Sequence, residues 1–385
     1  MTKLAEGLSQ KYDVHVICGY PRSSNGRGKL PKNEIHNSIH IERCFSTRFS
    51  KKYLLLRLAN FVTISICMFF KSLYNIRKND LTIAVTTPPL LPFAVALACK
   101  ITRSKCILRI EDVYPETLVA TGIARPRTIF VRLLAYFNKC LYKNVDHITV
   151  LGRDMKHLIT KSIDSRITAD YTTIVPNWAD LDLVVPKEKN CNQLISELEL
   201  NEKFVVQCAG NMGRAQAIED IFSAAEMLKE KTKIHFIFIG AGVKREWMKN
   251  EVTEKQLNNI TILEKRPRSD QSNFLNACDI AVVSLVSGMK GAAVPSRLYN
   301  IMAAGKPIVA IVENGSEVSL VIEEEQIGWV TLPGRPNALA DSILDAYSDS
   351  NRLQQMGSRA RLVAEYKYTY NQSVESYCEL IRNCL

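Results

Sequence analysis

The strongest constraint on the fold is an alternation of short apolar segments with helix-like segments, which runs twice along the chain. In the first half, we expect strands at 14–18, 81–85, 105–109, 147–150 and 174–175, with helices at 52–74, 90–100 and 126–141. After residue 200 the alternation restarts, with strands at 204–209, 234–239, 260–263, 279–285 and 308–312. Short apolar strands separated by helices are typical of parallel, doubly wound sheets. The pattern therefore predicts an α/β protein with two such domains.

A polar stretch at residues 178–200, which contains Pro186, separates the two halves and is typical of a linker. The length of 385 residues also fits two domains of roughly 150–200 residues each. We expect an N-terminal domain at 1–185, a C-terminal domain at 186–365 and a final helix at 366–385 that packs back on the N-terminal domain. Residues 1–10 have the pattern of a helix, so the first strand of the N-terminal domain is expected to be missing.

The formal charge of +11 is concentrated in the first half of the chain. Residues 1–185 hold 27 Lys and Arg against 14 Asp and Glu, whereas residues 186–385 hold 23 against 25. This split disfavours a protein that is basic throughout in order to bind nucleic acid. It favours an anionic membrane surface or an anionic lipid substrate on the first half. A basic face that serves only solubility is the alternative.

One apolar stretch, residues 50–71, has basic residues near both ends. Its longest apolar run, residues 61–70, is about half of what a bilayer span requires. It therefore predicts either a helix lying in a membrane interface or a buried core helix. The polar residues 1–10 do not have the pattern of a signal peptide. The 11 cysteines form no CxxC pair, which favours free thiols in a reducing cytosol.

Three strand ends in the second half are followed by loops that contain glycine. The first loop holds Gly210 and Gly213 with Arg214, and the second holds Gly240 and Gly242 with Lys244. Because the carboxyl ends of parallel strands lie at one edge of a sheet, these loops are expected to line a ligand crevice. Each glycine pair, taken alone, is also explained as an ordinary turn.

The third loop, residues 286–294, is poor in side chains and leads into the helix start Pro295-Ser296-Arg297. Pro and Ser are ordinary start signals for a helix, but they do not account for the cations Lys290 and Arg297 on either side of the loop. Such a loop before a helix suits a diphosphate. With no dinucleotide GxGxxG motif after a strand, the three loops favour a nucleoside diphosphate.

At these residues the sequence resembles the family 4 glycosyltransferases, which have the GT-B fold of two facing Rossmann-like domains. The C-terminal motifs are Gly210-Asn-Met-Gly-Arg-Ala-Gln216, Phe238-Ile-Gly-Ala-Gly242, Ala277-Cys-Asp279, Pro295-Ser-Arg-Leu-Tyr-Asn-Ile-Met-Ala-Ala-Gly-Lys-Pro307 and Gly315-Ser-Glu317. The N-terminal motifs are Thr86-Thr-Pro-Pro-Leu90, Glu111-Asp-Val-Tyr-Pro-Glu116 and Val175-Pro-Asn-Trp178, which are similar to those of bacterial L-fucosamine transferases.

The resemblance implies a hexosyltransferase that retains the anomeric configuration. Its donor would be a UDP-sugar, with an N-acetylated amino sugar expected, and its acceptor a polyprenyl-diphosphate-linked saccharide. The product would belong to a capsule, O-antigen or exopolysaccharide, made by a cytoplasmic protein that is peripheral on the inner face of the cell membrane. No metal or other cofactor is expected beyond the UDP-sugar co-substrate.

Carried over to this sequence, the resemblance assigns the donor diphosphate to Arg297 and the amides near Gly291, assisted by Arg214. It assigns Asp112 and Glu116 to the acceptor side, one of them taking the proton of the attacking hydroxyl. A structural turn around Pro115 is the alternative for both carboxylates. The expected donor-binding residues are Gly210, Asn211, Gly213, Arg214, Gln216, Gly240, Gly242, Lys244, Glu264, Arg266, Lys290, Gly291, Ala292, Ala293, Pro295, Ser296, Asn300 and Glu317, with Arg297 counted as catalytic.

The sequence departs from the common family pattern at several of these positions. Asn300 and Ala292 replace the two glutamates of a motif that bonds the ribose in many members. Asn211 stands where Arg is common, and Gln216 where Lys is common. Phosphate binding is therefore expected to depend more on Arg297 and Lys290.

Three alternatives remain open from the sequence. Asp180 and Asp182 could indicate a metal-dependent transferase, although linker carboxylates in solvent explain them better. A sugar-nucleotide epimerase can share the two-domain architecture, but it would need only a soluble substrate. A truncated, inactive membrane protein that binds UDP would follow from the missing first strand.

Overall fold

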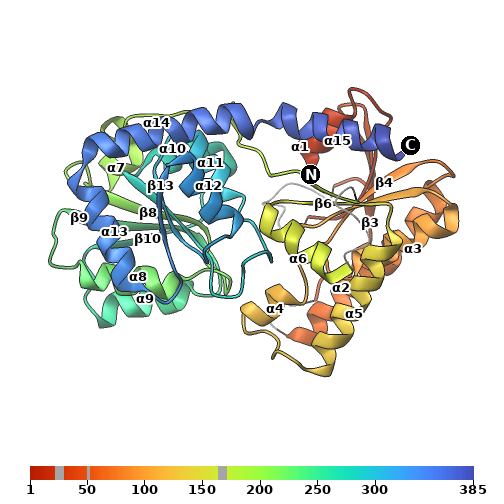
Figure 1. The fold of residues 1–385 in the computed structure, drawn as a ribbon, viewed down its shortest axis with the longest axis horizontal. Helices are drawn as coiled ribbons and strands as arrows, with labels where there is room; N and C mark the ends of the chain where they lie inside the picture. Colours follow the sequence, from red (N-terminus) through yellow and green to blue (C-terminus); the bar gives the residue numbers. More distant parts are fainter. Residues whose placement is uncertain (22–29, 50–52, 164–170) are drawn as a thin grey trace.

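The computed structural model describes residues 1–21, 30–49, 53–163 and 171–385, and Figure 1 shows two α/β units joined side by side. The C-terminal unit is built on one parallel six-stranded sheet with the order β10-β9-β8-β11-β12-β13. Its strands are β8 (Phe204–Asn211), β9 (Ile234–Ala241), β10 (Ile260–Leu263), β11 (Ile280–Ser284), β12 (Ile308–Ile311) and β13 (Gly328–Thr331). The predicted parallel, doubly wound sheet is confirmed here.

Helices cover both faces of this sheet because successive strand residues point to opposite sides. The helices are α7 (Gln193–Glu197), α8 (Ile218–Met227), α9 (Arg245–Glu254), α10 (Gln271–Asn276), α11 (Arg297–Ala303), α12 (Glu317–Glu325), α13 (Pro336–Ser348) and α14 (Ser350–Lys367). Val206 and Phe236 pack with α8, α9 and α13, whereas Val205 and Ile237 pack with α10, α11, α12 and α14. Two apolar layers therefore enclose the sheet and hold its strand ends in place.

The N-terminal unit has its strands in two sheets instead of one. Four parallel strands, β4 (Leu81–Val85), β5 (Lys105–Arg109), β6 (His147–Val150) and β7 (Thr172–Ile174), follow chain order. A second sheet has the order β1 (His15–Gly19), β3 (Ile39–Cys44), β2 (Asn33–His36), with β2 and β3 antiparallel. Asn37 and Ser38, both at positive φ, form the turn of this unpredicted hairpin.

The N-terminal helices include one that is long and largely apolar. They are α1 (Thr2–Leu8), α2 (Leu54–Asn75), α3 (Leu91–Thr102), α4 (Glu116–Ala120), α5 (Ile129–Asn144) and α6 (Arg153–Ile163). The predicted apolar helix at 52–74 is α2. In the described part of the chain, no helix has both the length and the apolarity to cross a bilayer.

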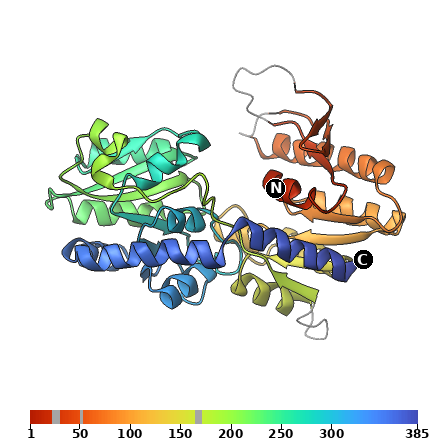
Figure 2. The same cartoon turned by 90° about the horizontal axis from the view of Figure 1, so that it is seen from above.

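The last helix, α15 (Tyr370–Cys384), lies against α1 and the N-terminal unit (Figure 2). Its fully buried Tyr377 accepts a hydrogen bond from Arg109 of β5 at 2.8 Å and contacts Thr149 of β6 at 3.0 Å. Leu4 and Ile107 share the same apolar cluster. The chain therefore crosses from one unit to the other twice, once near residue 178 and once before α15. The domain boundaries at 185 and 365 stay a prediction.

Candidate functional site

The strand ends of the two units meet face to face. On the C-terminal side, the parallel order brings the loops after β8, β9, β11 and β12 to one edge of the sheet. On the N-terminal side, the segments after β5 and β6 reach that edge. Val113 N donates to Ala292 O at 2.8 Å, and Asp112 and Ala293 form an isolated antiparallel bridge. The expected crevice loops therefore face the expected acceptor segment.

Arg297, the first residue of α11, lies beneath the loop that follows β8. Its Nη1 donates to Ala209 O at 3.2 Å, and its Nη2 donates to the side-chain oxygen of Gln216. Gly210, at φ +136°, has a backbone conformation that residues with a side chain rarely adopt, and it lies next to this guanidinium: a Cβ there would be in ordinary contact with Arg297 Cζ, at 3.4 Å. The structure thus brings together Arg297, Gly210 and Gln216 from two of the three predicted loops. The carboxamide of Gln216 orients the guanidinium without neutralising its charge.

Gly240 and Gly242, at the end of β9, are required by backbone packing. A Cβ on Gly240 would lie 1.8 Å from Gly210 O, and one on Gly242 would lie 2.2 Å from Met212 O. Lys244 Nζ donates to Gln216 O at 2.7 Å and pairs with Glu219 at 2.6 Å. Lys244 therefore holds the loop after β8 through Gln216 O and Glu219. A contact between Lys244 and the donor stays a prediction.

The loop after β11 is held by partners on both units. Gly291 N donates to Asp154 Oδ2 at 2.8 Å, and Ala292 N donates to Met289 O at 2.9 Å. Lys290 Nζ donates to Asn314 O at 2.7 Å, and Gly288 N and Lys290 N both donate to Glu313. In this conformation the amides of Gly291 and Ala292 already have acceptors. Arg297 is therefore the better-supported part of the predicted diphosphate site.

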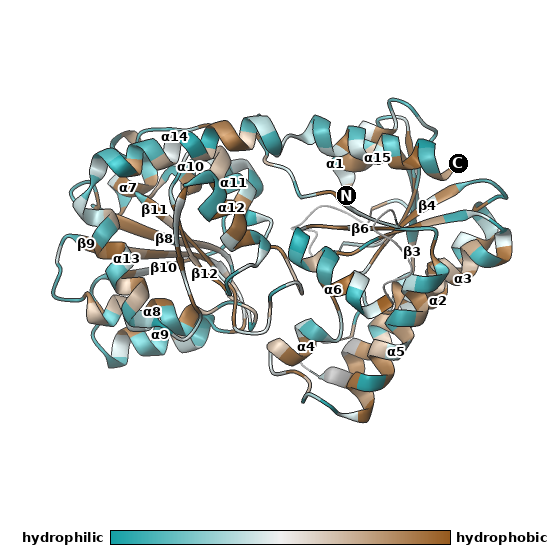
Figure 3. Ribbon diagram, in the orientation of Figure 1, coloured by the Kyte–Doolittle hydropathy of each residue, from teal (hydrophilic) through white to brown (hydrophobic). Residues whose placement is uncertain are grey.

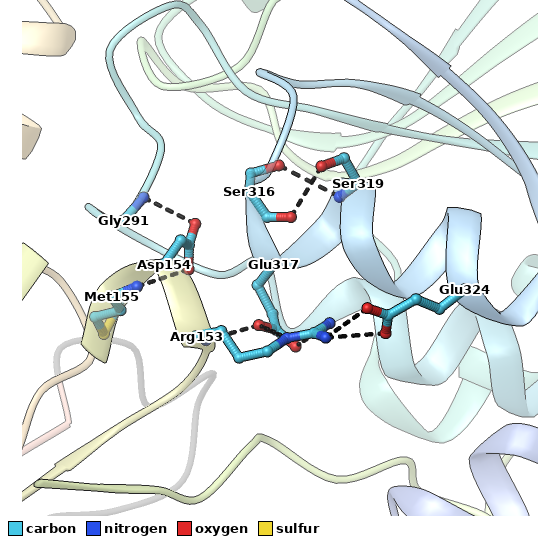
Figure 4. Close-up of polar contacts among 8 residues, drawn as sticks. All are labelled: Arg153, Asp154, Met155, Gly291, Ser316, Glu317, Ser319 and Glu324. Carbon is cyan, nitrogen blue, oxygen red and sulfur yellow. Dashed lines mark hydrogen bonds and ion pairs between the residues drawn. The ribbon is translucent and has the colours of Figure 1, made fainter. Parts of the chain in front are cut away.

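A cluster at the start of α6 joins the two units (Figure 4). The buried carboxylate of Glu317 accepts from Arg153 N at 2.7 Å and from Arg153 Nε at 3.0 Å, while Arg153 Nη1 also reaches Glu324 at 2.7 Å. Gly152 makes room, because a Cβ there would lie 2.7 Å from Glu317 Cβ. Glu317, expected near the donor sugar or ribose, thus pairs across the interface in this structure.

Sequence reasoning missed Arg153 and Asp154 as site residues. Both lie within four residues of the end of β6, at the start of α6, so they lie at the carboxyl edge of a parallel sheet. The strand-end rule that selected the C-terminal loops would have selected them as well.

Asp154→Ala is expected to lower the free energy of unfolding by about 1–3 kcal/mol, because the buried Gly291 N–H loses its acceptor. The measurement is chemical denaturation. Asp154→Asn, whose one amide oxygen can still accept from Gly291 N, should recover part of the loss, because its NH2 group cannot accept from Met155 N. Glu324→Ala is the control: its carboxylate is exposed, so the change should stay below about 1 kcal/mol. Equal stability of Asp154→Ala and the wild type would contradict this role for Asp154.

The acceptor side presents two carboxyl groups without ion pairs among the described residues. Burial raises the pKa of Asp112, and the charge of neighbouring Glu111 raises it further. Burial also raises the pKa of Glu116 at the start of α4, and its buried Oε2 has no hydrogen-bond partner in the described structure. Glu111 differs, because it accepts from Arg109 Nε at 2.5 Å. Asp112 and Glu116 are thus the carboxyl groups here whose pKa is shifted in the direction that suits a base near neutral pH.

Asn300 connects the site to the segment between the two units. Its side-chain oxygen accepts from Asp180 N at 2.9 Å, so the oxygen expected to face the ribose has a protein donor here. The Asp180 carboxylate is paired with Lys3 and Arg268, each at 2.8 Å. Burial alone would raise the pKa of Asp180, but the hydrogen bonds from Lys3 and Arg268 hold it below its usual value. A carboxylate committed to two cations gives no support to the metal-dependent alternative.

In the described part of the chain, no group of three or more His, Cys, Asp or Glu side chains could hold a metal ion.

The remaining predicted donor residues lie around the same edge. Glu264, which is 76% exposed at its side chain, pairs with Arg245 at 2.7 Å, and Arg266 pairs with Asp270 at 2.9 Å. Asn211 and Arg214 are exposed, and Gly213 packs against the Asn211 side chain. Ser296 follows Pro295 at the N-cap of α11 but makes no side-chain capping bond, unlike the cap expected from the sequence.

Comparisons with known proteins agree with this arrangement. Residues 192–363 match the family "Glycosyl transferases group 1". The probable glycosyltransferase WbjE of Pseudomonas aeruginosa is 34% identical over 309 residues, 80% of this chain and 76% of WbjE. The putative colanic acid biosynthesis glycosyl transferase WcaI of Escherichia coli (strain K12) is 23% identical over 272 residues, 69% of this chain and 66% of WcaI.

Among solved structures, Anabaena Alr3699/HepE in complex with UDP and glucose matches 90% of this chain and 87% of that protein, with a TM-score of 0.71 and 17% identity. At this identity the match supports the fold alone. The facing parallel sheets, the family match and the identity to WbjE lead to one conclusion: the chain belongs to the group 1 glycosyl transferases and has their two Rossmann-like domains.

Proposed function

We propose that this glycosyltransferase moves a sugar from a UDP-sugar to a polyprenyl-diphosphate-linked saccharide, with retention of the anomeric configuration. An N-acetylated amino sugar is the expected donor group. One observation carries the proposal. The cation Arg297 of the C-terminal unit and the carboxyl groups of Asp112 and Glu116 of the N-terminal unit lie on opposite sides of the same interface. Arg297 lies beneath the glycine loop after β8, and Asp112 is bridged to Ala293 of the loop that leads to Arg297.

The donor side is assigned to the C-terminal unit. In the transfer, the bond between the anomeric carbon and the diphosphate oxygen breaks, and negative charge develops on the departing UDP. A fixed guanidinium stabilises that charge more than it stabilises the bound substrate, which is how such a group accelerates the step. Arg297 is held for this role by Ala209 O and Gln216. A UDP complex of the structurally similar HepE supports the choice of nucleotide.

The acceptor side is assigned to the segment between Asp112 and Glu116. The acceptor hydroxyl forms the new bond to the anomeric carbon, and its proton passes to a carboxylate. Asp112 is the better choice as base, because its backbone contacts the loop that leads to the diphosphate site. Glu116 would position the acceptor. The raised pKa of each carboxyl, caused first by burial, favours proton uptake.

A role in surface-polysaccharide synthesis, such as a capsule, O-antigen or exopolysaccharide, is supported by the name of WcaI, which refers to colanic acid biosynthesis. A lipid-linked acceptor places the reaction at the inner face of the cell membrane. The basic first half of the chain, with 27 Lys and Arg against 14 Asp and Glu, supports that location.

The test is a screen of UDP-sugars for thermal stabilisation, followed by product analysis with and without a polyprenyl-diphosphate-linked saccharide. Transfer only in the presence of the lipid-linked acceptor supports the proposal. A changed UDP-sugar formed without acceptor would instead indicate an epimerase. UDP binding with no transfer to any acceptor would indicate an inactive protein. The reaction is expected to continue in excess EDTA, because the proposed steps use Arg297 and carboxyl groups and no metal.

A further inference from the structure

Two helices of the N-terminal unit expose rows of large apolar side chains. On α2, the exposed row is 42–79% accessible and consists of Leu55, Leu58, Val62, Ile66, Phe70 and Tyr74. On α5, the exposed row is 50–77% accessible and consists of Ile129, Phe130, Leu133, Tyr136 and Phe137. The spacings of three and four residues place each row on one side of its helix. These rows are the opposite of the polar outer face that a surface helix usually has.

The helix α3 joins the two rows into one face. It contacts both α2 and α5, and its Leu97 and Ile101 are more than half exposed. Figure 3 shows the three helices together at one end of the molecule, with mostly apolar residues. We name the exposed apolar residues of α2, α3 and α5 the apolar face. The apolar face extends over three helices, whereas exposed apolar residues on ordinary protein surfaces are scattered singly.

The charged residues of the three helices have one sign. The sequences of α2, α3 and α5 contain no Asp or Glu, but they contain six Lys and Arg. On α5, the exposed Arg132, Lys139 and Lys143 are seven and four residues apart, so they form a row beside the apolar row. Apolar side chains bordered by cations suit an anionic lipid surface, since both the acyl region and the headgroups find a complement.

The opposite side of α5 holds the expected acceptor segment. Buried Asn138 donates to Tyr114 O at 2.6 Å, between Asp112 and Glu116. Tyr142, also buried on α5, lies close enough to Glu116 that, after burial, the charge of Glu116 contributes to the raised pKa of its phenol. One helix therefore connects the apolar face with the carboxyl groups that would receive the acceptor.

We propose that the apolar face docks the protein on an anionic lipid bilayer, with α5 lying at the headgroup boundary. This choice of occupant rests on the proposed function, which requires a lipid-linked acceptor. A second copy of the chain fits less well, because the charged residues of these three helices are all cations, and two such faces would repel each other. Docking through α5 brings the segment from Asp112 to Glu116 near the membrane surface, where a polyprenyl-linked saccharide is presented.

The test is co-sedimentation of the full chain with vesicles of phosphatidylglycerol and phosphatidylethanolamine, compared with vesicles of phosphatidylcholine alone. The wild type should bind the anionic vesicles, and less in high salt. Leu133→Glu combined with Phe137→Glu should lower the partition coefficient by about tenfold or more. Lys139→Gln and Lys143→Gln should each lower it about fivefold on anionic vesicles. Leu362→Glu, at a 63% exposed leucine of α14, is the matched control and should bind like the wild type.

Thermal unfolding and UDP binding are measured for each variant, so that loss of docking is separated from loss of fold or of the proposed function. Vesicle binding that is unchanged in Leu133→Glu/Phe137→Glu would overturn the proposal. So would a folded wild type that does not bind anionic vesicles, or a dimer in solution that these substitutions dissociate. Vesicle binding without any UDP binding would leave the docking surface standing and count against the proposed transferase reaction.

Discussion

Arg297→Ala is expected to lower kcat/KM for transfer from a UDP-sugar by about 100- to 1000-fold, the usual cost of removing one group that stabilises charge in a transition state. The guanidinium is held by Ala209 O and Gln216, next to Gly210 at the end of β8. Because the developing charge of UDP is the target, the affinity for UDP should also fall. Steady-state kinetics and calorimetric UDP binding measure the two effects.

Arg359→Ala is the matched control for Arg297→Ala. Arg359 also donates from its guanidinium to a backbone carbonyl, that of Gln326, but it lies on α14 away from the strand ends. Its replacement should leave kcat/KM within about twofold, as expected of a surface contact. Arg297→Lys keeps the charge but not both hydrogen bonds, so its kcat/KM should be intermediate between those of the wild type and of Arg297→Ala. If Arg297→Ala is folded and its turnover is unchanged, Arg297 does not bind the donor diphosphate as proposed.

Much of the fold follows from local sequence pattern. The predicted strands at 81–85, 105–109, 147–150 and 260–263 have the same bounds in the structure. Buried parallel strands consist of short apolar runs, so their sequence carries the signal directly. The β2–β3 hairpin was missed because its four- and six-residue strands are half-exposed, so their sequence lacks an apolar run. Its signal was the Asn37-Ser38 turn.

The sequence predicts those parts of the site whose positions follow from the order of strands and loops along the chain. It does not predict the contacts that form where the two units meet. Parallel strands bring Gly210 and Arg297 to one edge, and this follows from the order of motifs. The partners of Gly291 and Glu317 are Asp154 and Arg153, more than 130 residues away, and nothing in the local sequence pairs them. Family resemblance therefore assigned Gly291 and Glu317 to the donor, while this conformation gives them partners from the other unit.

Asp112→Asn is expected to lower kcat/KM by about 100- to 10,000-fold, because the acceptor hydroxyl loses its proton acceptor. The wild-type rate should also have an acidic limb. Burial, together with the charge of Glu111, raises the pKa of Asp112 above the ordinary value of 3.8. Since the base acts in its ionised form, kcat/KM should fall as the pH drops through that raised pKa. The limb should be absent from the residual activity of Asp112→Asn.

The free energy of unfolding should not fall in Asp112→Asn, although kcat/KM does. Measuring both quantities therefore separates an effect on catalysis from an effect on folding. A carboxyl whose pKa is higher in the folded state than in the unfolded state contributes stability below its unfolded pKa, and this contribution is lost as the pH rises through the folded pKa. Asp112→Asn removes a buried charge at neutral pH, so the free energy of unfolding should stay equal or rise. Glu116→Gln is the matched variant and, as a positioning change, should raise KM for the acceptor more than it lowers kcat. A larger loss of kcat in Glu116→Gln than in Asp112→Asn would exchange the two roles, and an unchanged rate in both would place the base elsewhere.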